Sequence, residues 1–145
     1  MKDRERMREI VLYIVFGVLT TLVNWAVYYV MRRLTGLQTL DTHSAQYHLK
    51  GNVCNITAWF LSVLFAFVTN KKYVFQSTGT DRKKRWTELG LFFASRLTSY
   101  LIFDLLLYNV LLFVMNDLWD KLIVNVLVII FNYAASKWVV FRKKK

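Results

Sequence analysis

Residues 10–31 form a run of 22 residues without a charged side chain. At about 1.5 Å of rise per residue, a helix of this length is about 33 Å long, which is enough to cross the hydrocarbon core of a bilayer. Lipid offers no water to the polar groups of the backbone, so the run is expected to be helical despite its many valines and isoleucines. This feature directs the chain into a membrane.

Three further apolar runs follow, at residues 51–69, 89–115 and 118–136. The run at 89–115 contains Arg96 and Asp104, and the run at 118–136 carries Asp120 and Lys121 near its start. A chain of 145 residues that is 56% hydrophobic has too little interior to bury its apolar surface as a soluble protein. We therefore predict an all-α membrane protein, in which the whole chain forms one domain of four transmembrane helices arranged as two hairpins.

The basic residues are gathered in clusters between the apolar runs, which favours a membrane surface over nucleic acid as the partner of this chain of net charge +11. Fifteen lysines and arginines lie before the first run, after the second and after the fourth, whereas four lie on the other side. Positive residues are enriched on the cytoplasmic side of membrane proteins. Both termini are therefore predicted to be cytoplasmic.

The ends of the second and fourth runs resemble each other. A shift of 66 positions places residues 60–75 on residues 126–141, so that Asn70-Lys71 falls on Ser136-Lys137, and Val74-Phe75 falls on Val140-Phe141. Because each half has two spans, the halves would form a parallel repeat, an arrangement that transporters use to build a binding site. The alternative is that any helix leaving a membrane tends to end in lysine and aromatic residues.

Helical spacing places the polar residues of each run on one face. The four sets are Gly17, Thr20, Thr21 and Asn24; Asn52, Asn55, Ser62, Ala66 and Asn70; Arg96, Tyr100, Asp104 and Tyr108; and Lys121, Asn125, Asn132 and Ser136. Small and amide residues commonly join membrane helices, which explains most of these residues. It explains Arg96 poorly, because a charged arginine inside a span costs roughly 2.5–3.5 kcal/mol on insertion scales. Arg96 either pairs with Asp104 or receives an anion, for which a guanidinium suits phosphate oxygens.

These residues together resemble the GtrA family. The resemblance rests on Phe16-Gly17 and Asn24 in the first run, the segment from Asn70 to Phe75, Arg96, Asn132, and the segment from Ser136 to Phe141. It covers nearly the whole chain and is strongest to the branch that serves teichoic-acid glycosylation in Gram-positive bacteria. Ser136 departs from the pattern, because asparagine is more usual there.

The resemblance implies a flippase of the bacterial plasma membrane that moves a polyprenyl-phosphate-linked monosaccharide to the outer leaflet, for the glycosylation of teichoic acid or another surface polysaccharide. Arg96, Lys71, Lys137 and Lys121 would bind the phosphate. Asn24, Asn70, Asn125 and Asn132 would bond to sugar hydroxyls, with Asp104 on the same polar faces as a candidate proton carrier. Val74, Phe75, Phe92 and Trp138 would pack in the motifs, against sugar or prenyl surface or toward lipid.

The sequence contains no glycine-rich phosphate loop, no nucleophile beside a base and no metal-ligand cluster, so neither an enzyme nor a cofactor is expected. The expected partners are membrane glycosyltransferases and further copies of this chain. Three other functions stay open: a membrane subunit that recruits a glycosyltransferase through the basic residues 82–85, a small drug exporter, and a membrane glycosyltransferase. The drug exporter is disfavoured because the basic groups repel cations.

Overall fold

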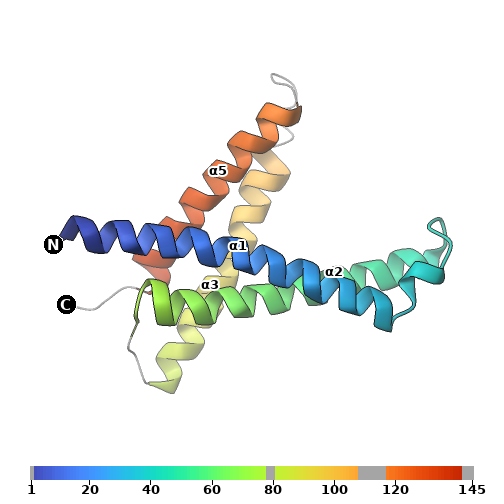
Figure 1. The fold of residues 1–145 in the computed structure, drawn as a ribbon, viewed down its shortest axis with the longest axis horizontal. Helices are drawn as coiled ribbons and strands as arrows, with labels where there is room; N and C mark the ends of the chain where they lie inside the picture. The colour runs from blue at the N-terminus through green and yellow to red at the C-terminus, as the bar shows by residue number, and fades with distance from the viewer. Residues whose placement is uncertain (1, 78–80, 108–116, 142–145) are drawn as a thin grey trace. The chain divides into compact units, whose positions relative to one another are not determined.

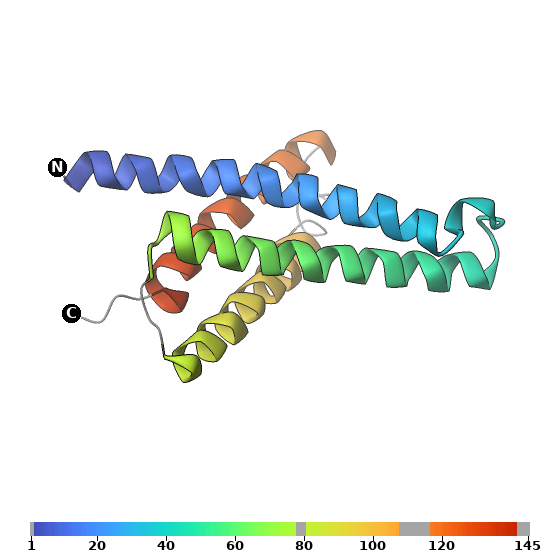
Figure 2. The ribbon, with the colours of Figure 1, turned by 60° about the horizontal axis from the view of Figure 1, so that its bottom comes forward.

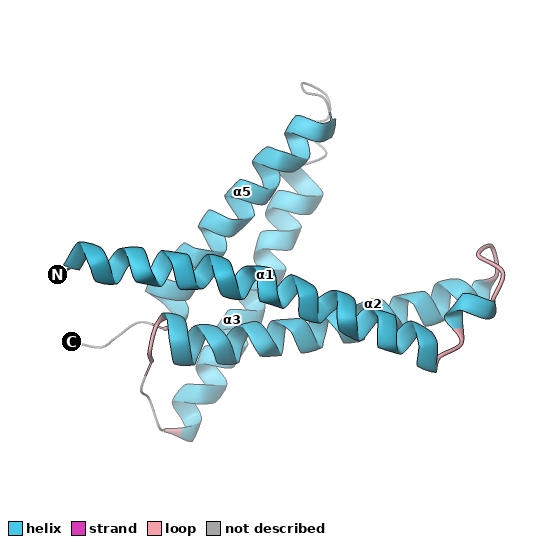
Figure 3. Ribbon diagram, viewed as in Figure 1, coloured by secondary structure: helices cyan, strands magenta, loops and turns pink. Residues whose placement is uncertain are grey.

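The computed structural model describes residues 2–77, 81–107 and 117–141, with side chains except for residues 2, 104–106 and 117–122. Every regular element in these ranges is helical, which confirms the predicted class (Figures 1 and 3). The chain divides into two compact units, Met1–Gln76 and Ser77–Lys145.

The first unit is a hairpin of two long helices, α1 (Lys2–Leu34) and α2 (Ala45–Thr69), which lie side by side (Figure 2). The turn begins at Gly36, whose φ of 65° is in the left-handed region that suits glycine, and continues through the short 3₁₀ helix η1 (Leu37–Thr39). Ser44 then caps α2, because its side chain accepts a hydrogen bond from the backbone N–H of Tyr47 at 3.1 Å. Lys50 closes the turn by donating to the carbonyl of Thr35 at 2.9 Å.

The second unit contains α3 (Arg82–Ser99), the π-helical segment η3 (Tyr100–Leu107) and α5 (Asp117–Ala135). Asp81 caps α3 by accepting from the N–H of Lys83 at 3.2 Å. The rings of Phe103 and Phe131 lie 5.4 Å apart and join η3 to α5. The unit is therefore a second hairpin, as the prediction of two hairpins requires.

Both hairpins end in the same local structure. Helix α2 continues into the π-helical turn η2 (Asn70–Val74), and α5 continues into η4 (Ser136–Val140). Each turn closes with a 2.9 Å bond across five residues, from Phe75 N to Asn70 O and from Phe141 N to Ser136 O. The two segments that the 66-residue shift relates thus share a backbone conformation, while the parallel repeat of the two hairpins stays a prediction.

The first helix of each hairpin packs against the phenylalanine that ends the π-helical turn. The centroid distances are 6.3 Å for Tyr13 and Phe75 and 6.0 Å for Phe92 and Phe141. These contacts relate Tyr13 and Phe92 by 79 positions.

Three helical stretches in the described part of the chain are long and apolar enough to cross a membrane: Asp3–Leu34, Ala45–Val74 and Ile123–Val140. The first two exceed the uncharged runs at 10–31 and 51–69, because a membrane helix can continue past the hydrocarbon core. In the apolar window of the first stretch, 6% is buried within the chain, so most of its apolar surface faces outward. The expected span at 89–115 lies partly outside the described residues, and the four-span count and cytoplasmic termini stay predictions.

Candidate functional site

The polar residues predicted on one face of α1 form two kinds of hydrogen bond, between helices and within the helix. Asn24 donates from its Nδ2 to Ser62 Oγ at 3.4 Å and so links α1 to α2. Thr20 and Thr21 donate instead to carbonyls one turn earlier in their own helix, at 2.7 and 3.3 Å. Asn24 therefore joins two helices, as amide side chains commonly do in membranes, whereas the two threonines satisfy their hydroxyl groups within α1.

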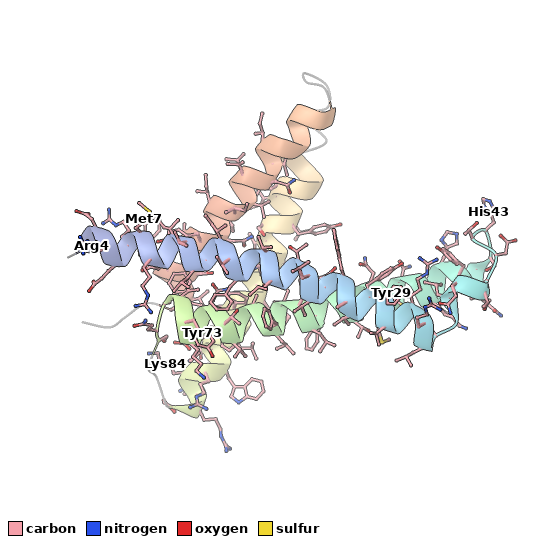
Figure 4. All side chains as sticks on the ribbon, in the orientation of Figure 1. Arg4, Met7, Tyr29, His43, Tyr73 and Lys84 are labelled. Atoms are coloured by element: carbon pink, nitrogen blue, oxygen red, sulfur yellow. The ribbon has the colours of Figure 1, made fainter. Side chains whose placement is uncertain are left out.

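The end of this hairpin buries an amide. Asn70 is buried, and its Nδ2 donates to the carbonyl of Ala66 at 2.7 Å, while its Oδ1 has no hydrogen-bond partner among the described residues. Beside it, Lys71 Nζ lies 5.9 Å from the centroid of the Phe67 ring. Val74 is buried on the inner side of η2. Figure 4 shows Tyr73 near this end and His43 at the opposite end of the hairpin.

The end of the second hairpin is more polar. Asn132 and Ser136 are 3% and 0% exposed, and neither Asn132 Oδ1 nor Ser136 Oγ has a hydrogen-bond partner in the described ranges. Lys137 donates to the hydroxyl of Tyr133 at 3.0 Å, and its Nζ lies 5.3 Å from the centroid of that ring. Burying a polar atom without a hydrogen-bond partner costs free energy, so such an atom is expected to bind a ligand or a water molecule.

Arg96 occupies the last turn of α3, where its guanidinium carbon lies 4.8 Å from the centroid of the Phe92 ring. The guanidinium is half-buried, while Phe92 is fully buried and also contacts Phe141. A guanidinium over an aromatic face keeps its charge and gains an electrostatic attraction. Arg96 is thereby positioned by the same aromatic contact that anchors η4.

Among the remaining predicted site residues, two are exposed, and the side chains of two others lie outside the described ones. Asp104 lies in η3 and Lys121 in α5, but their side chains are outside the described ones, so the Arg96–Asp104 pair stays untested. Asn125 is exposed on α5, as is Trp138, at 67%, on η4. Among the motif aromatics, Phe75 and Phe92 are buried within the protein, whereas Tyr73 and Trp138 are exposed.

The sequence analysis did not identify two side chains near these groups, Glu88 and Tyr133. Glu88 is 3% exposed, accepts a hydrogen bond from Ser77 Oγ at 3.0 Å and lies 3.8 Å from Lys84 Nζ. The spacing of four residues between Lys84 and Glu88 is a signal that could have revealed this pair. Tyr133 stands four residues before Lys137, as Phe67 does before Lys71, and the repeat could have revealed it.

The described helices are long and apolar, and they carry the cationic side chain of Arg96 and buried polar atoms of Asn70, Asn132 and Ser136. These features define a helical integral membrane protein. The sequence matches the family described as "GtrA/DPMS, transmembrane domain" over residues 12–141. The chain belongs to the GtrA family.

Named relatives support this assignment. The chain is 36% identical over 143 residues to the "Cell wall teichoic acid glycosylation protein GtcA" of Listeria monocytogenes, an alignment that covers 97% of this chain and 90% of that protein. It is 34% identical, with the same coverage, to the protein of that name in Listeria innocua. It is also 39% identical over 136 residues to the "Uncharacterized membrane protein YwcD" of Bacillus subtilis, covering 92% of this chain and 97% of that one.

Proposed function

We propose that this protein is a flippase that moves a polyprenyl-phosphate-linked monosaccharide from the cytoplasmic to the outer leaflet of the bacterial plasma membrane. The observation that carries the proposal is the occurrence of the buried atoms Asn70 Oδ1, Asn132 Oδ1 and Ser136 Oγ, without partners among the described residues, near the ends of membrane-length helices. Such atoms fit a substrate that brings hydroxyl groups into an apolar protein.

The substrate combines a charged headgroup with a long apolar tail. The tail stays in lipid while Arg96, on the ring of Phe92, balances the phosphate charge during the crossing. Lys71 and Lys137 attract the phosphate at the cytoplasmic end, and Lys121 receives it near the outer end. The amides of Asn24, Asn70, Asn125 and Asn132 replace the water around the sugar hydroxyls.

The names of two relatives support a proposal for the cellular role. Because two of them are named for cell wall teichoic acid glycosylation, we propose that this chain supplies the lipid-linked sugar for that modification or for another surface polysaccharide. A cytoplasmic glycosyltransferase would load the lipid and an outward-facing one would use it. The movement runs downhill or is coupled to a gradient, with Asp104 as the proton carrier in the coupled case, and further copies of the chain complete the path.

A recruiting subunit is the second candidate. The basic residues at 82–85 are exposed at the start of α3, where they can bind a partner protein or anionic lipid. This function needs no polar groups inside the membrane, and it predicts that substitutions at these positions matter more than a substitution at Arg96.

Reconstitution separates the two candidates. The purified protein is placed in liposomes that contain a short-chain polyprenyl-phosphate glucose, and the rate at which the sugar becomes accessible on the opposite leaflet is measured. We expect Arg96→Gln to slow this movement about tenfold or more, because a phosphate loses its charge-assisted bonds. Arg82→Gln, the same change in the exposed cluster, should leave the rate unchanged. Folded wild-type protein that moves no sugar would reject the flippase and favour the recruiting subunit.

A further inference from the structure

The two hairpin ends share a backbone but differ in side chains. A shift of 66 positions relates four pairs in the last turns of α2 and α5 and the first positions of η2 and η4: Ala66 and Asn132, Phe67 and Tyr133, Asn70 and Ser136, and Lys71 and Lys137. The lysine is kept in both halves. The second half has Asn132 in place of Ala66 and Tyr133 in place of Phe67, whereas the first half has the amide Asn70 in place of Ser136. The second half therefore carries more polar side chains at these positions.

The added hydroxyl changes how the lysine is held. Lys71 lies over the Phe67 ring at 5.9 Å, whereas Lys137 lies over Tyr133 at 5.3 Å and also donates to its hydroxyl at 3.0 Å. A neutral hydroxyl fixes the position of an ammonium group without cancelling its charge. Lys137 is therefore positioned in advance by Tyr133, which lowers the entropy that an anion must remove on binding.

The added amide places two buried polar groups one turn apart. Asn132 and Ser136 are four residues apart, so their side chains lie on the same face of α5 and its continuation. Asn132 Oδ1 can accept a hydrogen bond, and Ser136 Oγ can accept or donate one. In the first hairpin the equivalent pair is Ala66 and Asn70, and Asn70 spends its amide nitrogen on the carbonyl of Ala66.

We propose that the end of α5 with η4, and not the equivalent end of α2 with η2, is the main binding site for the phospho-sugar headgroup. Lys137, positioned by Tyr133, binds the phosphate, and Asn132 with Ser136 binds hydroxyls of the sugar. This inference rests on the proposed function and specifies which half of the repeat carries out its recognition step.

Binding in lipid nanodiscs tests the phosphate half of the site. The full-length protein is titrated with geranyl phosphate and, for comparison, with uncharged geraniol. Tyr133→Phe keeps the ring and removes the hydroxyl, and we expect it to weaken geranyl phosphate binding about two- to tenfold, the range for one long side chain that must be ordered on binding. Geraniol binding should not change, whereas a general structural defect would weaken both. Phe67→Leu, at the equivalent position, should leave both affinities at the wild-type value.

Glucosyl geranyl phosphate tests the sugar half. Its affinity relative to bare geranyl phosphate should fall about three- to tenfold in Ser136→Ala. Ser95→Ala is the matched control, because Ser95 already donates to the carbonyl of Phe92 at 2.8 Å. An unchanged ratio in Ser136→Ala would mean that the buried atoms hold only water and would overturn the inference.

Transbilayer movement, measured on the same variants, separates this inference from the flippase itself. If the variants change probe binding as predicted but the protein moves no lipid, the proposed site stands and the flippase is rejected. If lipid movement persists but Tyr133→Phe and Ser136→Ala bind both probes as the wild type does, the flippase stands and the proposed site is rejected. Phosphate binding that depends on Phe67 instead of Tyr133 would assign the site to the first hairpin and would also reject the inference.

Discussion

Phe92 connects the arginine to the end of the second hairpin, and we predict that Phe92→Leu lowers the free energy of unfolding by about 2 kcal/mol. The buried ring contributes about 0.5–1.5 kcal/mol through its contact with Phe141 at 6.0 Å. Its contact with the guanidinium of Arg96, whose central carbon lies 4.8 Å from the ring centroid, contributes about 0.5–1 kcal/mol more. The shape mismatch of leucine in a filled site adds up to about 1.5 kcal/mol. We take the lower part of this range, because unfolded helices in detergent find other partners.

Equilibrium unfolding in mixed micelles, followed by circular dichroism, measures this cost. In a Phe141→Leu background the aromatic pair is already lost, so Phe92→Leu should cost about 1 kcal/mol less than in the wild type. The matched control is Phe60→Leu, at a ring that is 47% exposed on α2, for which we expect a change within about 0.5 kcal/mol. Strictly additive costs for the two ring substitutions, or an equal cost at Phe60, would refute the reasoning.

Three further predictions concern the first hairpin and the membrane topology. Asn24→Ala should lower the free energy of unfolding by about 0.6 kcal/mol, the average for hydrogen bonds between membrane helices, because its bond to α2 is long at 3.4 Å; a loss above about 2 kcal/mol would contradict this. Gly36→Ala should cost about 1–2 kcal/mol in the same unfolding measurement through its φ of 65° alone, since an added Cβ meets no atom closer than 3.7 Å; an unchanged stability would contradict a left-handed turn. On intact cells, an impermeant maleimide should label Gln38→Cys and not Thr87→Cys, while the buried Cys54 stays unlabelled; the reverse pattern would place the termini outside.

The sequence alone determined the all-helical fold class. Uncharged runs long enough to cross a bilayer must be helical, because the backbone has no other source of hydrogen bonds in lipid. The helices extend past the runs into charged residues, as at Lys2–Leu34, where water is available again. The repeat of Val-Phe endings also correctly related the two hairpins, although it did not indicate that each one ends in a π-helical turn.

The tertiary structure decided which polar residues are buried and what they contact. Asn125 and Asn132 are two turns apart on one predicted face, yet Asn125 is exposed and Asn132 is buried. Helical periodicity gives the direction of a side chain from its own axis, but burial depends on the neighbouring segments, which only the packed chain supplies. The contact of Lys137 with Tyr133, by contrast, is local. A spacing of four residues along one helix brings the two side chains together, so the sequence alone was enough to indicate this contact.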